Sequence, residues 1–68
     1  MEEVQLTKRE IDVIVLIAQE YTTKEIADEL LLSTHTVESY RKILISKLNV
    51  RNLAGLTKYA VINELYKL

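Results

Sequence analysis

Five polar side chains recur at helical spacing in the middle of the chain: His35, Glu38, Ser39, Lys42 and Ser46. A helix turns about 100° per residue, so these residues would share one face, opposite an apolar stripe of Val37, Leu44 and Leu48. Short polar groups with one acid and one lysine suit contact with base-pair edges in a DNA major groove about 12 Å wide. The alternative is the solvent-facing side of an ordinary amphipathic helix.

The same segment could suggest hydrolytic chemistry, because Ser33, His35 and Glu38 are close in sequence. Helix capping and surface exposure explain these three residues, and no third group is evident to orient a catalytic base. A 68-residue chain also has little room for an enclosed substrate pocket. We therefore expect no enzyme activity and no catalytic residues.

The composition excludes several other classes of protein. The chain has no cysteine and one histidine, so disulfides and zinc sites are not expected, and we predict no metal and no cofactor. Hydrophobic residues make up 49% and charged residues 28%, as in a soluble globular domain. No apolar run reaches the roughly 18 residues of a membrane span, and the first residues are acidic rather than signal-like. We expect a cytoplasmic protein that does not contact a membrane.

The net charge of −1 hides a strong asymmetry along the chain. Residues 1–32 hold three basic and eight acidic side chains, whereas residues 33–68 hold six basic and two acidic ones. One side of the molecule could therefore meet phosphates while the other repels them. Uneven charge also arises by chance in small domains.

Three similar segments predict where helices begin: LTKREI from Leu6, YTTKEI from Tyr21 and LSTHTV from Leu32. Each has an apolar residue, then Ser or Thr, then a second apolar residue four positions later, which is the pattern of a hydrophobic staple around an N-cap. Glu10 and Glu25 complete capping boxes with Thr7 and Thr22. Helices should begin near residues 8, 23 and 34.

The remaining boundaries follow from Ser33, Asn49 and Asn52. Ser33 can end one helix and cap the next while Leu32 turns into the core, and Asn49 suits a left-handed helix end. Gly55 should weaken a fourth helix only slightly. We predict a single all-α domain over residues 1–68, a four-helix, bundle-like fold with helices near 8–19, 23–31, 34–48 and 52–66.

The second and third predicted helices are joined by a very short turn, which indicates a helix-turn-helix. In that motif the second helix reads DNA and the first braces it. We assign base contacts to His35, Glu38, Ser39 and Lys42. Phosphate contacts are assigned to Thr22, Lys24, Ser33, Thr36, Tyr40, Arg41, Lys47 and Arg51. For Lys24 and Lys47, simple solvated surface charge is the alternative.

The chain from about Leu6 to Leu65 resembles the DNA-binding domain of the LuxR/NarL/GerE family of bacterial transcription regulators. The matching elements are LTKRE, LIA, KEIA, STHTVES and KLNV, in that order. The resemblance implies binding to double-stranded DNA through the third helix, with the fourth helix pairing two copies. It also implies a response-regulator output domain with an N-terminal receiver domain, or a stand-alone regulator. RNA polymerase is a further candidate partner.

Three residues depart from the family pattern. Glu20 stands where glycine is common, so the first helix could end differently. Glu38 stands where lysine is more usual and offers an acceptor suited to the amino group of cytosine. Tyr40 stands where histidine is common, which favours support of the helix or a phosphate contact over base reading.

Apolar residues on the fourth predicted helix spread beyond a single face. A second protomer could cover the excess, and we place a homodimer interface on Leu56, Tyr59, Ala60 and Asn63. The alternative is that this small domain buries the helix itself.

Two other kinds of domain could contain the same pair of helices. One is a sigma-factor-like promoter-binding module, and the other is a protein-interaction domain that retains the fold. The KLNV segment at Lys47 and the fourth helix favour the LuxR-type pattern over the first. A DNA reader should lose affinity steeply with salt, which separates it from the second. We also expect Lys42→Ala to relax base choice and Lys47→Ala to weaken binding to all sequences alike.

Overall fold

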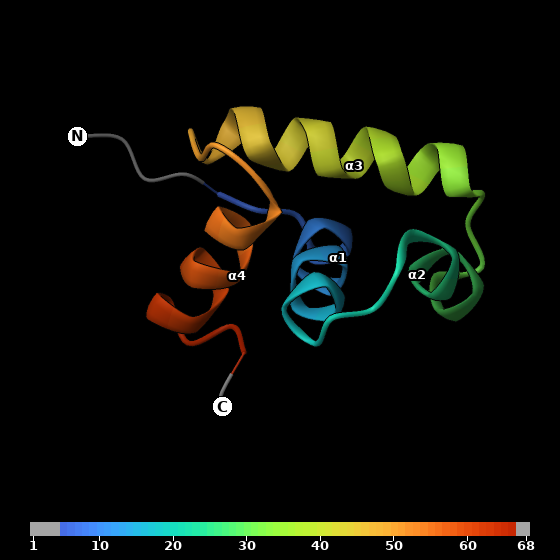
Figure 1. Cartoon of the computed structure of the whole chain (residues 1–68), viewed down its shortest axis with the longest axis horizontal. Coiled ribbons are helices and arrows are strands. Elements are labelled where there is room, and N and C mark those ends of the chain that lie inside the picture. Colours follow the sequence, from blue (N-terminus) through green and yellow to red (C-terminus); the bar gives the residue numbers. More distant parts are fainter. Residues whose placement is uncertain (1–4, 67–68) are drawn as a thin grey trace.

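The computed structural model describes residues 5–66 and contains four helices: α1 (Lys8–Ala18), α2 (Thr23–Leu30), α3 (Thr34–Lys47) and α4 (Leu53–Ile62). Figure 1 shows α3 lying across the other three helices, with α1 between α2 and α4. The described residues form no strand. The predicted all-α class is therefore confirmed, and the first three helices lie within one residue of their predicted bounds.

All four helices begin at a side chain that caps the first turn. Thr7 and Thr22 each accept a hydrogen bond from the backbone N–H of Glu10 and Glu25, at 3.1 Å, and each glutamate accepts one in return from its threonine's backbone N–H at 2.8 Å. Both capping boxes are confirmed. Ser33 Oγ accepts from the N–H of Thr36 at 3.0 Å, as predicted, and Asn52 Oδ1 accepts from Gly55 at 3.1 Å.

All four helices also end in the same way, and none of them ends at a glycine. Glu20, Leu31, Asn49 and Glu64 each adopt a positive φ of 53–66° just after a helix. In each case the next residue donates its N–H to a carbonyl five positions earlier, as Leu32 does to Ala27 at 2.9 Å. This is the Schellman arrangement. Asn49 was predicted to end α3 in this way, whereas the left-handed Leu31, which produces the break before α3, was not.

The prediction that the fourth helix reaches residue 66 is wrong. It ends at Ile62, because Glu64 turns to φ 58° and Leu65 donates its N–H back to Ala60 at 2.8 Å. The reversal returns Leu65 and Tyr66 to the protein, where they pack against the core. Two residues assigned to the helix thus form part of the packed C-terminal segment.

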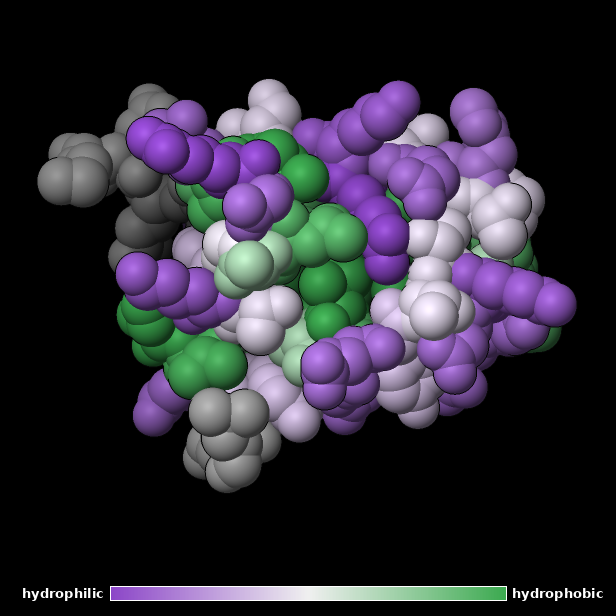
Figure 2. All heavy atoms as spheres, in the orientation of Figure 1, coloured by the Kyte–Doolittle hydropathy of each residue, from purple (hydrophilic) through white to green (hydrophobic). Residues whose placement is uncertain are grey.

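One core joins the four helices, with α1 at its centre. Its fully buried side chains are Val13, Ile14, Ile26, Val37, Leu44, Leu56 and Ala60. Among the described residues α1 contacts the other three helices, and α3 contacts α2 and α4, but α2 and α4 do not meet. In Figure 2 hydrophilic side chains line much of the edge formed by α3, and hydrophobic atoms gather between α4 and α1.

Gly55 has a packing role that the sequence did not reveal. A Cβ atom at this position would lie 2.8 Å from Cβ of Val50, closer than side chains tolerate. The first turn of α4 can therefore approach the segment after α3 only because residue 55 has no side chain.

Within residues 5–66, no helix combines the length and the apolar character needed to cross a bilayer.

Candidate nucleic-acid interface

The outer side of α3 forms a continuous polar surface. The helix has 14 residues, which corresponds to about 21 Å at 1.5 Å per residue. Val37 and Leu44 are completely buried, and Leu48 packs against the core, so the rotation of the helix is fixed with the opposite side outward. His35, Glu38, Lys42 and Ser46 are exposed and Ser39 is partly exposed. The chain thus leaves bare the face on which base contacts were predicted.

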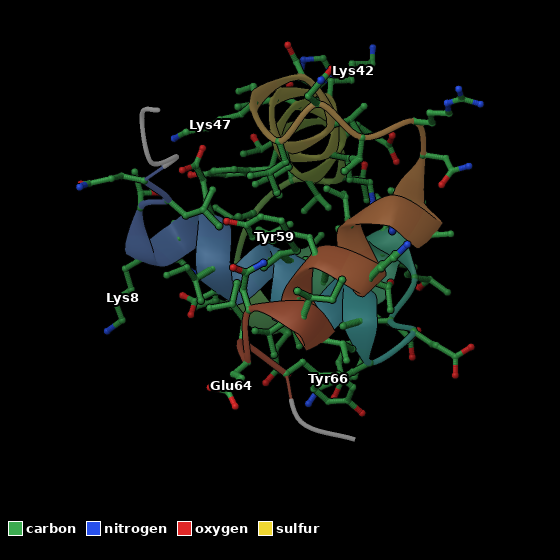
Figure 3. All side chains as sticks on the ribbon, turned by 90° about the vertical axis from the view of Figure 1, so that its left-hand side faces the viewer. Lys8, Lys42, Lys47, Tyr59, Glu64 and Tyr66 are labelled. Carbon is green, nitrogen blue, oxygen red and sulfur yellow. The ribbon has the colours of Figure 1, made fainter. Side chains whose placement is uncertain are left out.

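Figure 3 looks along α3 and shows Lys42 on the side of the helix away from the other three. Lys42 takes part in no ion pair with another described residue. Its ammonium group is available to an external acceptor. We retain Lys42 as a candidate base contact.

Glu38 is exposed but already engaged within the protein. Its Oε1 accepts a hydrogen bond from Thr23 Oγ1 on α2 at 2.8 Å, and the same oxygen lies 3.8 Å from Nη1 of Arg41. About half of the Glu38 side chain remains exposed, at 51%. One carboxylate oxygen is therefore held by the protein, a contact that sequence reasoning missed because the two helices had to be docked before Thr23 and Glu38 could meet.

Arg41 is sheltered rather than free. Its side chain is 16% exposed, and its buried Nε has no hydrogen-bond partner among the described residues. Only the outer nitrogens of the guanidinium can reach a phosphate. Tyr40 is half-buried and packs against the core, which agrees with the supporting role considered for it.

Lys47 forms an ion pair within the protein. Its Nζ lies 2.9 Å from Oε1 of Glu10, a residue 5% exposed in the first turn of α1, whereas the Lys47 side chain is 32% exposed. The ammonium group therefore already has an anionic partner inside the protein. Lys47 thus links α1 to α3, and its phosphate contact, with the expectation that Lys47→Ala weakens binding to all DNA sequences alike, stays a prediction.

The environment of Glu10 lowers the pKa of its carboxyl group. The hydrogen bond from the backbone N–H of Thr7 is the largest cause, followed by the hydrogen bond from Lys47, and burial opposes both only in part. Glu10 therefore remains ionised in the folded protein at neutral pH. A hydrogen bond from the backbone of Thr22 likewise lowers the pKa of Glu25.

The other predicted phosphate contacts gather at helix starts. Thr22 and Lys24 lie at the start of α2, next to the Thr23–Glu38 contact, and both are exposed. Ser33 and Thr36 lie at the start of α3, where Ser33 Oγ donates to Thr36 Oγ1 at 2.9 Å. Arg51 is exposed just beyond the far end of α3. Candidate phosphate contacts thus lie near both ends of α3, in addition to Tyr40 and Arg41 within it.

Two residues of the predicted dimer interface are core residues instead. Leu56 and Ala60 are fully buried within the protomer, so they have no surface to offer a second copy. Tyr59 is half-buried and packs against the core, and in Figure 3 it lies below α3 in the middle of the view. Asn63 is exposed, and its side-chain amide donates to the carbonyl of Tyr59 at 2.9 Å. Ile62, which was not predicted, is the large apolar residue that α4 exposes most, at 66%.

Comparison with known proteins agrees with this arrangement. The sequence profile of the family described as "Bacterial regulatory proteins, luxR family" matches residues 4–60. The chain belongs to this family. Its core, its capped helix starts and its helix-turn-helix are therefore those of a luxR-family domain, as the sequence motifs had indicated.

Similar curated proteins are regulators too. The chain is 40% identical to the oxygen regulatory protein NreC of Staphylococcus carnosus over 60 residues, which are 88% of this chain and 28% of that protein. The NreC proteins of Staphylococcus epidermidis and Staphylococcus aureus are 38% identical over the same shares. This luxR-family domain thus spans little more than a quarter of the length of these relatives. Family and relatives support a DNA-binding regulatory domain rather than an enzyme.

Proposed function

We propose that this luxR-family domain binds double-stranded DNA sequence-specifically as part of a bacterial transcription regulator, with α3 in the major groove. The supporting observation is the outer face of α3, whose polar side chains are exposed while Val37 and Leu44 on the inner face are fully buried. A helix with its side chains is about 10–12 Å across, which matches the width of the groove.

In this proposal the base contacts come from four residues on α3: His35, Glu38, Ser39 and Lys42. The phosphate contacts come from residues on α3 and next to it: Thr22, Lys24, Ser33, Thr36, Tyr40, Arg41, Lys47 and Arg51. Phosphate contacts at both ends of α3 would fix its position along the groove, since such contacts set register without reading sequence.

We further propose that two copies pair on DNA through the exposed surface of α4. The proposed interface consists of Leu53, Tyr59, Ile62 and Asn63. It omits Leu56 and Ala60 of the predicted set, because these two side chains are fully buried within the protomer. By family resemblance, a receiver domain controls the pairing and RNA polymerase is a partner on the promoter. The site of action would be the cytoplasm, where bacterial DNA lies.

Selection of bound duplexes from a random pool tests the proposal. We expect a two-fold-symmetric consensus, because paired copies would read two half-sites related by the symmetry of the dimer. A single half-site would retain DNA reading but reject pairing through α4. No enrichment at any ionic strength would reject the DNA-binding function and favour the protein-interaction alternative.

The role of Lys42 is tested on the selected sequence. Lys42→Ala should relax one position in each half-site, at a cost of about 1–3 kcal/mol in discrimination. Lys8→Ala is the matched control, because Figure 3 shows Lys8 on α1, directed away from α3. An unchanged consensus with Lys42→Ala would contradict the position of α3 in the groove.

A further inference from the structure

Thr23 and Glu38 form the one side chain–side chain hydrogen bond between α2 and α3 among the described residues. Thr23 Oγ1 donates to Glu38 Oε1 at 2.8 Å across a separation of 15 residues in sequence. Thr23 itself is well fixed, because it is the first residue of α2 and follows the capping box of Thr22 and Glu25. The rigid start of one helix therefore holds a side chain of the next.

The hydrogen bond and the nearby arginine act on the same carboxylate oxygen. Arg41 Nη1 lies 3.8 Å from Oε1, and the Arg41 side chain is only 16% exposed, so its position is restricted as well. Oε2 of Glu38 has no hydrogen bond or ion pair with the described residues, while half of the side chain is exposed. One oxygen is thus anchored and the other is left as an acceptor.

We propose that Thr23 is a positioning residue that sets the base preference of Glu38, an inference that rests on the proposed function. A glutamate on a bare helix face would have to be ordered when DNA binds, and that ordering costs free energy. With Oε1 held by Thr23, Oε2 is oriented in advance toward the groove. A lone acceptor in this place suits the N4 amino group of cytosine, which presents a donor in the major groove without the N7 acceptor that accompanies the amino group of adenine.

The arrangement also distinguishes a role of Thr23 in base recognition from a role in phosphate contact. Thr23 contributes to recognition through Glu38 and makes no base contact itself. Its loss should therefore weaken the base preference at one position and leave the remaining positions unaffected. A threonine that merely contacted a phosphate would instead affect every sequence equally.

The experiment uses the consensus selected by the wild-type domain. Glu38→Ala first identifies the base pair that depends on Glu38. Binding is then measured to four duplexes that differ only at that pair, for the wild type, Thr23→Val and Thr23→Ser. Valine has the shape of threonine without the hydroxyl group, whereas serine keeps the hydroxyl group. Thermal unfolding of each variant confirms that all are compared in the folded state.

We expect Thr23→Val to lower the preference for cytosine at that pair by about 3- to 10-fold, and Thr23→Ser to retain it. Equal weakening on all four duplexes, or an unchanged preference with Thr23→Val, overturns the inference, as does a Glu38→Ala variant that selects the wild-type consensus. A wild-type domain that selects no consensus overturns the proposed function and this inference with it. The two failures are therefore distinguishable.

Discussion

The Glu10 carboxylate is the buried charged group among the described residues, and two donors hold it. One is the backbone N–H of Thr7 in its own helix cap, and the other is Lys47 Nζ at the end of α3. A buried charge is tolerated only with such partners, and removal of one partner leaves the other uncompensated. The pair therefore adds a polar link between α1 and α3 to their packing in the shared core.

We expect Lys47→Met to destabilise the fold by about 1–3 kcal/mol, less than for a fully buried pair because Lys47 is partly exposed. Lys42→Met is the matched control and should change stability by no more than about 0.5 kcal/mol, since Lys42 projects away from the other helices. Urea unfolding at pH 7 measures both. Equal effects of the two substitutions would show that the ion pair contributes nothing.

The lowered pKa of Glu10 also predicts a pH dependence. An unfolded glutamate has a pKa of about 4.3, so a lower pKa in the folded state gives stability that is present above that pH. This contribution is lost as the pH falls through the folded pKa. Between pH 7 and pH 3, the wild type should therefore lose more of its free energy of unfolding than Glu10→Gln, which cannot titrate at this position. Parallel losses, measured by urea unfolding at each pH, would contradict the assignment.

Some residue-level features could be predicted from the sequence and others could not. The bareness of His35, Glu38 and Lys42 could be predicted, because helical periodicity and the burial of Val37 fix which side faces outward. The pairing of Glu10 with Lys47 could not, because 37 residues separate them and no local pattern connects them. Leu56 and Ala60 were misassigned because apolar side chains on several faces of α4 do not reveal which face the protomer covers.

At the scale of the helices, every end relies on a left-handed residue other than glycine. Such a conformation costs an ordinary side chain roughly 1–2 kcal/mol, and it is compensated here by the two hydrogen bonds of the Schellman motif. At three of the four ends the following residue, Leu32, Val50 or Leu65, also packs against the core. Packing therefore decides where the helices stop, despite the backbone strain.

Glu20→Gly should raise the stability of the domain by about 1 kcal/mol, because glycine adopts the positive φ of 66° without steric cost. Gln19→Gly is the matched control. Gln19 has a φ of −81°, so glycine relieves no strain there and should be neutral or destabilising. Thermal or urea unfolding of the two variants measures the difference. A Glu20→Gly variant no more stable than Gln19→Gly would mean that the left-handed turn carries no strain.

Helix starts were predictable and most helix ends were not, for a physical reason. An N-cap uses a specific type of side chain, so Thr7, Thr22 and Ser33 indicate in the sequence where the next helix begins. A left-handed end without glycine has no such marker unless the residue is Asn, as at Asn49. Leu31 and Glu64 have side chains that give no indication of a positive φ, and so the early end of α4 was missed.

Over the whole molecule, charge is divided between the helices. Helix α2 carries three carboxylates and one lysine, whereas α3 carries three cations and one carboxylate. Of the α3 cations, Lys47 is paired with Glu10 and Arg41 is sheltered. Few exposed basic groups therefore remain near the proposed interface, mainly Lys24, Lys42 and Arg51.

This distribution predicts a shallower salt dependence of DNA affinity than the steep loss expected from the sequence. Each phosphate neutralised contributes about −0.9 to the slope of log affinity against log salt, so a slope of about −2 to −3 per protomer is expected. Arg51→Ala should flatten it by about 1, whereas Lys8→Ala should leave it unchanged because Lys8 points away from α3. Binding titrations on the selected duplex across a salt series measure these slopes. Equal slopes for both variants would place Arg51 away from the phosphates.

The lack of contact between α2 and α4 among the described residues has a mechanical consequence. A partner that binds α4 can influence α2 only through α1 or α3, whereas it can influence α3 directly, because α4 contacts α3. Leu56 and Ala60 of α4 are fully buried in the shared core, so α4 cannot loosen without disturbing the helices packed against it. When a partner binds α4, the protection of amide hydrogens against exchange should therefore change more in α3 than in α2, and hydrogen exchange of the free and bound domain measures the difference.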